Sequence, residues 1–138
     1  MGKIKIEEGV STCAKFNAKL PLPRSDLENK DYITAAKQMV KYSGSIAIDL
    51  NDVKQEGNFV TSTGEKPSYF NWSAVVNRTP KHSGPLFEPN NGCCYNGKKW
   101  TISENYVQLY TQALFTMEKE KWGDASAEQM VDIICEKY

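Results

Sequence analysis

The chain has 138 residues, 40% of them hydrophobic, and its 17 basic and 17 acidic side chains give a net charge of zero. This length suits a single globular domain over residues 1–138 with enough chain to bury a core. Zero net charge argues against nucleic acid and anionic membranes as partners. The chain has no run of about 18 apolar residues, so the sequence predicts no membrane span. The single histidine, His82, excludes a multi-histidine metal centre and leaves a Ser–His–Asp triad dependent on one ring.

The first third of the chain predicts two helices among short extended segments. Residues 3–6 alternate polar and apolar, which is typical of a strand, and residues 10–18 fit a short helix. The Leu-Pro-Leu-Pro run at 20–23 predicts an extended break. A Ser-x-x-Glu capping box then begins a helix expected to run from residue 25 to about Tyr42.

The rest of the chain predicts strands around one long loop. Alternating or apolar segments favour strands at residues 46–50, 57–60, 69–72, 106–110 and 131–135, with residues 113–117 continuing the fourth. A domain with helices first and strands after them belongs to the α+β class.

The long loop, about 73–105, holds three prolines and both adjacent cysteines, Cys93 and Cys94. A loop of this length is uncommon in a compact domain and is usually functional.

Oxygen-bearing side chains gather in and around this loop: Glu88, Asn90, Asn91, Glu104, Asn105 and Asp124. Calcium takes about six to eight oxygen ligands, which loops supply readily. In an extended Glu88-Pro89-Asn90 segment the first and third side chains leave on the same side. Composition alone favours the alternative that these residues are simply solvated.

The four cysteines are Cys13, Cys93, Cys94 and Cys135, and their spacing fits no zinc motif. A bond between Cys13 and Cys135 would close a loop worth about 4 to 5 kcal/mol in the chain-entropy model. Such a bond would imply an oxidising compartment. The alternative is four reduced cysteines in the cytosol.

A series of landmarks, in order and spacing, resembles one family over nearly the whole chain. The landmarks are Cys13-Ala14, Leu20–Ser25, Asp26–Asn29, Leu50–Asp52, Glu56–Phe59, Gly64–Trp72, Glu88–Asn91, Trp122–Asp124 and Ile134–Lys137. Together they are similar to the C-type lectin-like domain.

The resemblance implies a double-loop α+β fold in which the first and last cysteines, Cys13 and Cys135, are bonded. The family's second disulfide would fall at Tyr106 and Ala127, so both of its cysteines are absent here. Cys93 and Cys94 would then bond to each other, bond to another chain or stay free.

The resemblance also implies a calcium ion (Ca2+) held by Glu88, Asn90, Glu104 and Asp124. Two neighbouring sugar hydroxyls would bind the ion and hydrogen-bond to the same four residues. In the family, the Glu-Pro-Asn order accompanies mannose, fucose or N-acetylglucosamine. A second calcium, found in some members, would use Asp52, Glu56, Asn91, Glu104 and Asn105.

Two departures from the family pattern bear on this site. Gly123 stands where the family has Asn, which removes one calcium ligand and one sugar donor. Asp49 stands where the family's Trp-Ile-Gly-Leu element has Gly. Of the tryptophans, Trp122 and Trp72 are expected in the core, and Trp100 in the long loop is open to either core packing or sugar stacking.

The sequence thus predicts a secreted, non-enzymatic lectin for mannose-type glycans on cell surfaces or glycoproteins. Because such sites are weak singly, a homo-oligomer is expected, and a bond from Cys93 or Cys94 to another chain is one way to link it. The alternative is a calcium-independent protein-binding module on the same fold, which Gly123 favours.

Overall fold

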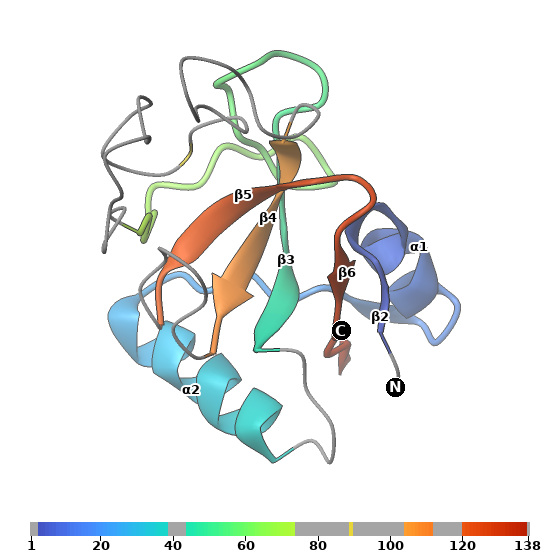
Figure 1. Cartoon of the computed structure of the whole chain (residues 1–138), viewed down its shortest axis with the longest axis vertical. Coiled ribbons are helices and arrows are strands. Elements are labelled where there is room, and N and C mark those ends of the chain that lie inside the picture. The colour runs from blue at the N-terminus through green and yellow to red at the C-terminus, as the bar shows by residue number, and fades with distance from the viewer. Residues whose placement is uncertain (1–2, 39–43, 74–88, 90–103, 112–119, 138) are drawn as a thin grey trace, which may run out of the picture.

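The computed structural model describes residues 3–38, 44–73, 89, 104–111 and 120–137. It confirms the α+β class (Figure 1). In chain order the elements are β1 (Ile4–Lys5), a 3-10 helix (Ile6–Glu8), α1 (Gly9–Ala14), β2 (Ala18–Lys19), α2 (Asp26–Lys37), β3 (Ser45–Asn51), β4 (Glu104–Tyr110), β5 (Trp122–Ser126), β6 (Met130–Val131) and β7 (Glu136–Lys137).

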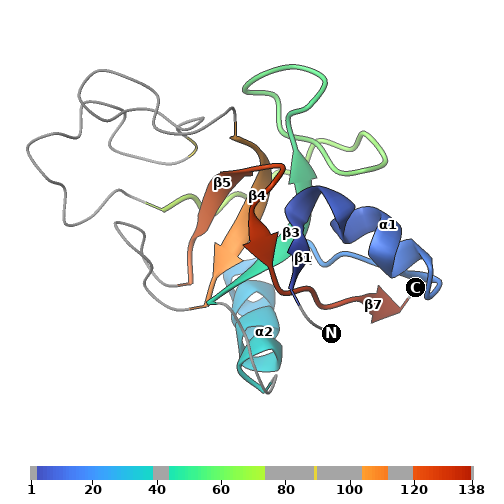
Figure 2. The same ribbon diagram turned by 45° about the vertical axis from the view of Figure 1, so that its right-hand side comes forward.

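The strands form one central sheet and two short ribbons. The sheet is antiparallel in the order β3-β4-β5, while β1 pairs with β6 and β2 pairs with β7. The two ribbons join the first 20 residues to the last 10, so the two ends of the described chain lie near each other (Figure 2).

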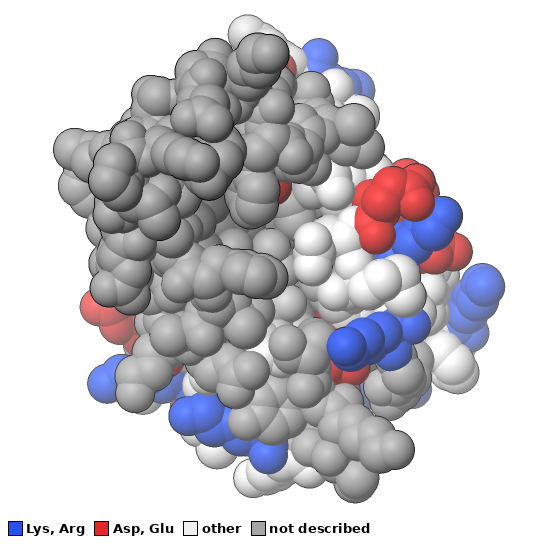
Figure 3. All heavy atoms as spheres, in the orientation of Figure 1, with Lys and Arg blue, Asp and Glu red and all other residues white. Residues whose placement is uncertain are grey.

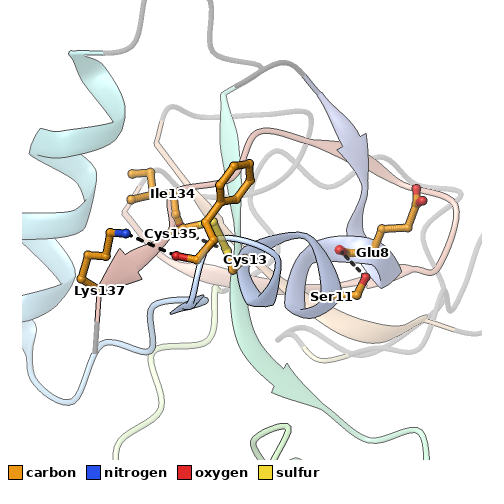
Figure 4. The surroundings of a disulfide bond; sticks show 7 residues. Glu8, Ser11, Cys13, Ile134, Cys135 and Lys137 are labelled. Carbon is orange, nitrogen blue, oxygen red and sulfur yellow. Dashed lines mark hydrogen bonds between the residues drawn. A yellow bond between two sulfur atoms is a disulfide. The ribbon is translucent and has the colours of Figure 1, made fainter.

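The Cys13–Cys135 disulfide locks this arrangement of the ends, as the sequence predicted (Figure 4). Its Cα atoms are 5.3 Å apart and its cysteines are 122 positions apart. Beside it, Lys137 Nζ donates to the Phe16 carbonyl oxygen at 3.3 Å. The bond therefore fastens α1 to the C-terminal segment.

Strand β3 lies at one edge of the three-stranded sheet and is nevertheless buried on both faces. Ile46 and Ile48 pack in the cluster that includes Ile33 of α2, and Ala47 packs on the other side with Cys13 of α1. The two helices lie on opposite sides of the sheet (Figures 1 and 2). Simple polar–apolar alternation is therefore replaced by nearly continuous burial.

Helix α2 begins with a modified capping box. Ser25 Oγ accepts from the Glu28 amide at 3.2 Å, as predicted. The Glu28 carboxylate accepts from the Arg24 amide at 3.0 Å, one residue before the amide that a capping box uses. The helix ends at Lys37, so its expected extension to Tyr42 is wrong.

Two tyrosines link α2 to the rest of the molecule. The Tyr69 hydroxyl donates to Asp26 at 2.6 Å, and the Tyr32 hydroxyl donates to Glu136 at 3.0 Å. Burial first, and then the carboxylate partner, raises the pKa of each hydroxyl well above its usual range. Both therefore stay protonated donors at neutral pH.

Several expected strands differ from the structure. Residues 57–60 and 69–72 contribute only the single bridges Asn51–Val60 and Trp72–Trp122. At the C-terminus, only Val131 of the expected strand 131–135 belongs to β6. Strand β5 was not predicted, because its Trp-Gly-Asp-Ala-Ser sequence has low β-propensity. Residues 113–117 lie outside the described residues.

Candidate functional site

Segment 71–73 leads from the core to the long loop along the edge of β5. The Trp122 amide donates to the Asn71 carbonyl and the Ser73 amide to the Trp122 carbonyl, both at 2.8 Å. This pairing runs parallel to β5 through the Trp72–Trp122 bridge. The start of the loop is therefore fixed against the central sheet.

Of the Glu88-Pro89-Asn90 triplet, only Pro89 lies within the described residues. Asn91 and most of the long loop lie outside them. Pro89 lines a pocket of about 280 Å³. The other lining residues are Gly57, Phe59, Lys66, Phe70 and Trp72. The middle of the triplet thus lies beside the aromatic residues that precede the loop.

A β-bulge orients Glu104 where the chain returns from the loop. Glu104 lies opposite Ser126, and Tyr106 lies opposite Ala125, so the bulge falls between Glu104 and Tyr106. Cross-strand partners share a face of a sheet, as do residues two apart on one strand. The bulge therefore turns Glu104 to the face that carries Asp124.

The two carboxylates differ in exposure. Glu104 is half-buried at the start of β4. Asp124 is only 2% exposed and lies opposite Val107 in the middle of the sheet. The register thus brings two of the four proposed calcium ligands, which lie 20 positions apart in the sequence, to one face of the sheet.

Asp52 connects the bulge to the preceding loop. Its amide donates to the Asn105 carbonyl at 3.0 Å, and its Oδ2 accepts from the Gly57 amide at 2.8 Å. Asp52 is 2% exposed, and its Oδ1 has no hydrogen-bond partner in the part of the chain that is described. Glu56, in the same loop, is exposed.

These residues fit a calcium site only in part. Within the described ranges, no three His, Cys, Asp or Glu side chains come close enough to hold a metal ion. Carboxylate oxygens are the donors that calcium prefers, and Glu104, Asp124 and Asp52 supply them. A full set of ligands would require the triplet and Asn91.

Gly123 is enclosed by a side chain that sequence reasoning did not consider. A Cβ added at Gly123 would lie 2.5 Å from Tyr110 Oη and 2.8 Å from Tyr110 Cε2. Tyr110 is 5% exposed, and Gln108 Nε2 donates to its hydroxyl at 3.3 Å. The tyrosine therefore excludes the family's asparagine side chain from this position.

A cluster of hydrogen bonds around the Glu120 carbonyl was also not predicted from the sequence. The carbonyl of Glu120 accepts from Asn29 Nδ2 at 2.8 Å and from Asn71 Nδ2 at 2.9 Å. Trp122 Nε1 donates to Asn29 Oδ1 at 2.8 Å, and Trp122 is fully buried, as expected. Glu120 has a φ of +66°, which is uncommon for a residue other than glycine, and these two bonds hold its carbonyl in place. The one sequence signal for this cluster was Asn29, a polar residue in the interior of the predicted helix.

Charge on the described surface is mixed. Basic and acidic side chains lie close to one another on the face in Figure 3. Among the described residues, no helix is long and apolar enough to span a membrane.

Comparison with known proteins identifies the fold and the family. The model of the lectin C-type domain matches residues 3–137. Pulmonary surfactant-associated protein D from Sus scrofa is 28% identical over 131 residues, which are 94% of this chain and 27% of that protein. The chain therefore spans about a quarter of that relative's length.

Two solved structures show how widely the fold is shared. The human scavenger receptor C-type lectin carbohydrate-recognition domain has a TM-score of 0.69 at 22% identity, over 98% of this chain and 84% of that one. A calcium-independent type II antifreeze protein has a TM-score of 0.61 at 14% identity, over 97% and 78%. Since the family model spans nearly every residue, the chain belongs to the C-type lectin domain family, whose members are non-enzymatic binding modules.

Proposed function

We propose that this domain binds mannose-type glycans through a calcium ion in the long-loop region. The ligands would be Glu88, Asn90, Glu104 and Asp124. The single observation that carries the proposal is the bulge in β4, which turns Glu104 to the face of Asp124. Relatives whose names include a carbohydrate-recognition domain support the broader statement that the ligand is a sugar.

Bound calcium would supply open coordination positions for two adjacent hydroxyls of mannose, fucose or N-acetylglucosamine. The protein's part is to orient those hydroxyls. The carboxylates of Glu88 and Glu104 would accept hydrogen bonds from them, and the amide of Asn90 would donate. Burial of Asp124 keeps its carboxylate away from competing water.

A second calcium would use Asp52, Glu56, Asn91, Glu104 and Asn105. It is supported by the buried Asp52 Oδ1, which has no partner among the described atoms. A buried carboxylate oxygen without a donor is costly, and a cation would offset that cost.

An affinity column of immobilised mannose tests the proposal. The wild type should be retained with calcium, released by a chelator, and competed by free mannose rather than galactose. Glu104→Gln should reduce retention at least about tenfold, because it removes a charged ligand that also accepts from the sugar. Asp31→Asn, on the exposed face of α2, is the matched control and should behave as the wild type.

Two results would contradict the proposed calcium site. If calcium neither raises the melting temperature nor supports retention on mannose, the calcium site does not exist. If Glu104→Gln is retained as strongly as Asp31→Asn, the ligand assignment is wrong.

A second function is a calcium-independent module that binds protein through the same loop face. The Tyr110–Gly123 contact favours it, because it removes the asparagine amide that calcium-binding members use. Specific capture of a protein partner that persists in chelator would support this alternative over the lectin.

We also propose an extracellular location and a homo-oligomer, the latter linked through Cys93 or Cys94. The Cys13–Cys135 bond supports an oxidising compartment. Weak single sites would gain avidity from assembly. Light scattering that shows a monomer at high concentration would contradict the oligomer.

A further inference from the structure

The pocket beside Pro89, hereafter the aromatic pocket, is distinct from the carboxylates of the calcium proposal. It has a volume of about 280 Å³ and is lined by Gly57, Phe59, Lys66, Phe70, Trp72 and Pro89. That volume is close to the lower end of small-ligand sites. Neither Glu104 nor Asp124 lines it.

Its walls are aromatic and mutually packed. The rings of Phe59 and Trp72 have centroids 5.0 Å apart, and those of Phe70 and Trp72 are 6.0 Å apart and within 16° of parallel. Trp72 also meets Trp122 edge-on at 5.9 Å, which anchors it to the core. Phe70 and Trp72 nonetheless remain partly exposed. The pocket thus presents fixed apolar ring surface, against which the C–H face of a sugar ring packs well.

Lys66 is the charged residue among the described residues that line the pocket, and its side chain is exposed. Its Nζ donates to the neutral Asn58 Oδ1 at 3.3 Å, and the ion pairs of the described residues, Lys5–Glu128 and Arg24–Glu65, do not include it. The ammonium therefore has no carboxylate to neutralise it in that part of the chain.

We propose that the aromatic pocket is a second sugar subsite, selective for a ring that carries a carboxylate or a sulfate. The apolar rings would hold the C–H face, and Lys66 would pair with the anion. The position of Pro89 in both regions puts this ring next to the one that the triplet would hold, so the inference rests in that respect on the proposed function.

Binding of four defined monosaccharides, measured by titration at low salt, tests the inference. The probes are N-acetylglucosamine, N-acetylglucosamine 6-sulfate, glucuronic acid methyl glycoside and N-acetylneuraminic acid methyl glycoside. At least one anionic sugar should bind about fivefold more tightly than N-acetylglucosamine, the ratio that about 1 kcal/mol of charge pairing gives. The sulfate and carboxylate probes distinguish the two sources of the anion.

Lys66→Gln should abolish that preference, because it removes the charge and keeps much of the side chain. Lys54→Gln is the matched control: Lys54 is exposed, lies in the same region of the chain and does not line the pocket. It should keep the preference.

The inference is overturned if no anionic sugar exceeds N-acetylglucosamine, or if the preference survives Lys66→Gln. If mannose still binds with calcium in that case, the proposed function stands alone. A Lys66-dependent preference that persists in chelator would support the subsite without bearing on the calcium mechanism, which the mannose column tests separately.

Discussion

At the scale of single residues, the exchange of the family's Asn for Gly123 depends on Tyr110. The phenol ring fills the space that any side chain at position 123 would need. An asparagine at position 123 therefore cannot be accommodated unless the Tyr110 side chain moves. The two positions form a complementary pair on one face of the sheet.

Gly123→Asn should lower the free energy of unfolding by about 1 to 3 kcal/mol, because the new Cβ overlaps a buried ring. Urea denaturation measures the change. Gly123→Asn combined with Tyr110→Val should be less destabilised than the sum of the two single variants, since the neighbours share one space.

Gly64→Asn is the control for that substitution. Gly64 has a φ of +88°, which Asn tolerates better than most residues, and a Cβ there meets nothing within 4 Å. Its cost should stay below about 1 kcal/mol. Equal costs at positions 64 and 123 would mean that the Tyr110 contact is unimportant.

At the scale of elements, α2 depends on a cap that was evident in the sequence. Ser25 caps its first turn and Glu28 accepts from the Arg24 amide. In β4, the bulge between Glu104 and Tyr106 orients a proposed ligand, and nothing in the local pattern of residues 104–110 predicts it.

Ser25→Ala should destabilise the domain by about 1 kcal/mol, the usual cost of losing an N-cap. Thermal unfolding measures the effect. Thr34→Ala on the same helix is the control: its hydroxyl donates only to the Lys30 carbonyl on the exposed surface, so the variant should be close to neutral. A Ser25→Ala protein as stable as Thr34→Ala would contradict the role of the cap.

At the scale of the whole molecule, the ends of the chain hold the domain closed. The two short ribbons, each of two-residue strands, are too small to be stable alone. The disulfide keeps them together across 122 positions of sequence.

The double variant Cys13→Ser/Cys135→Ser should lose about 2 to 5 kcal/mol of stability. Denaturant unfolding of both proteins measures the loss. Ser11→Ala, an exposed change on α1, controls for disturbance of that helix. An unchanged midpoint in the double variant would mean that the ribbons and core alone close the fold.

The α+β class, the helix start at Ser25, the strand around Ile46 and the resemblance to the family could all be predicted from the sequence. These features arise from local signals: a cap, a hydrophobic period and ordered landmarks. The Cys13–Cys135 pair, which the family resemblance implied, and the placement of Trp122 in the core were also predicted.

The contacts between segments far apart in the chain could not be predicted in this way. The bulge beside Asn105, the Tyr110 ring over Gly123 and the two asparagines on the Glu120 carbonyl each join residues whose own neighbours give no sign of the contact. Pairing register and ring packing depend on the whole sheet, because the free energy of each contact is set by segments far away in the chain.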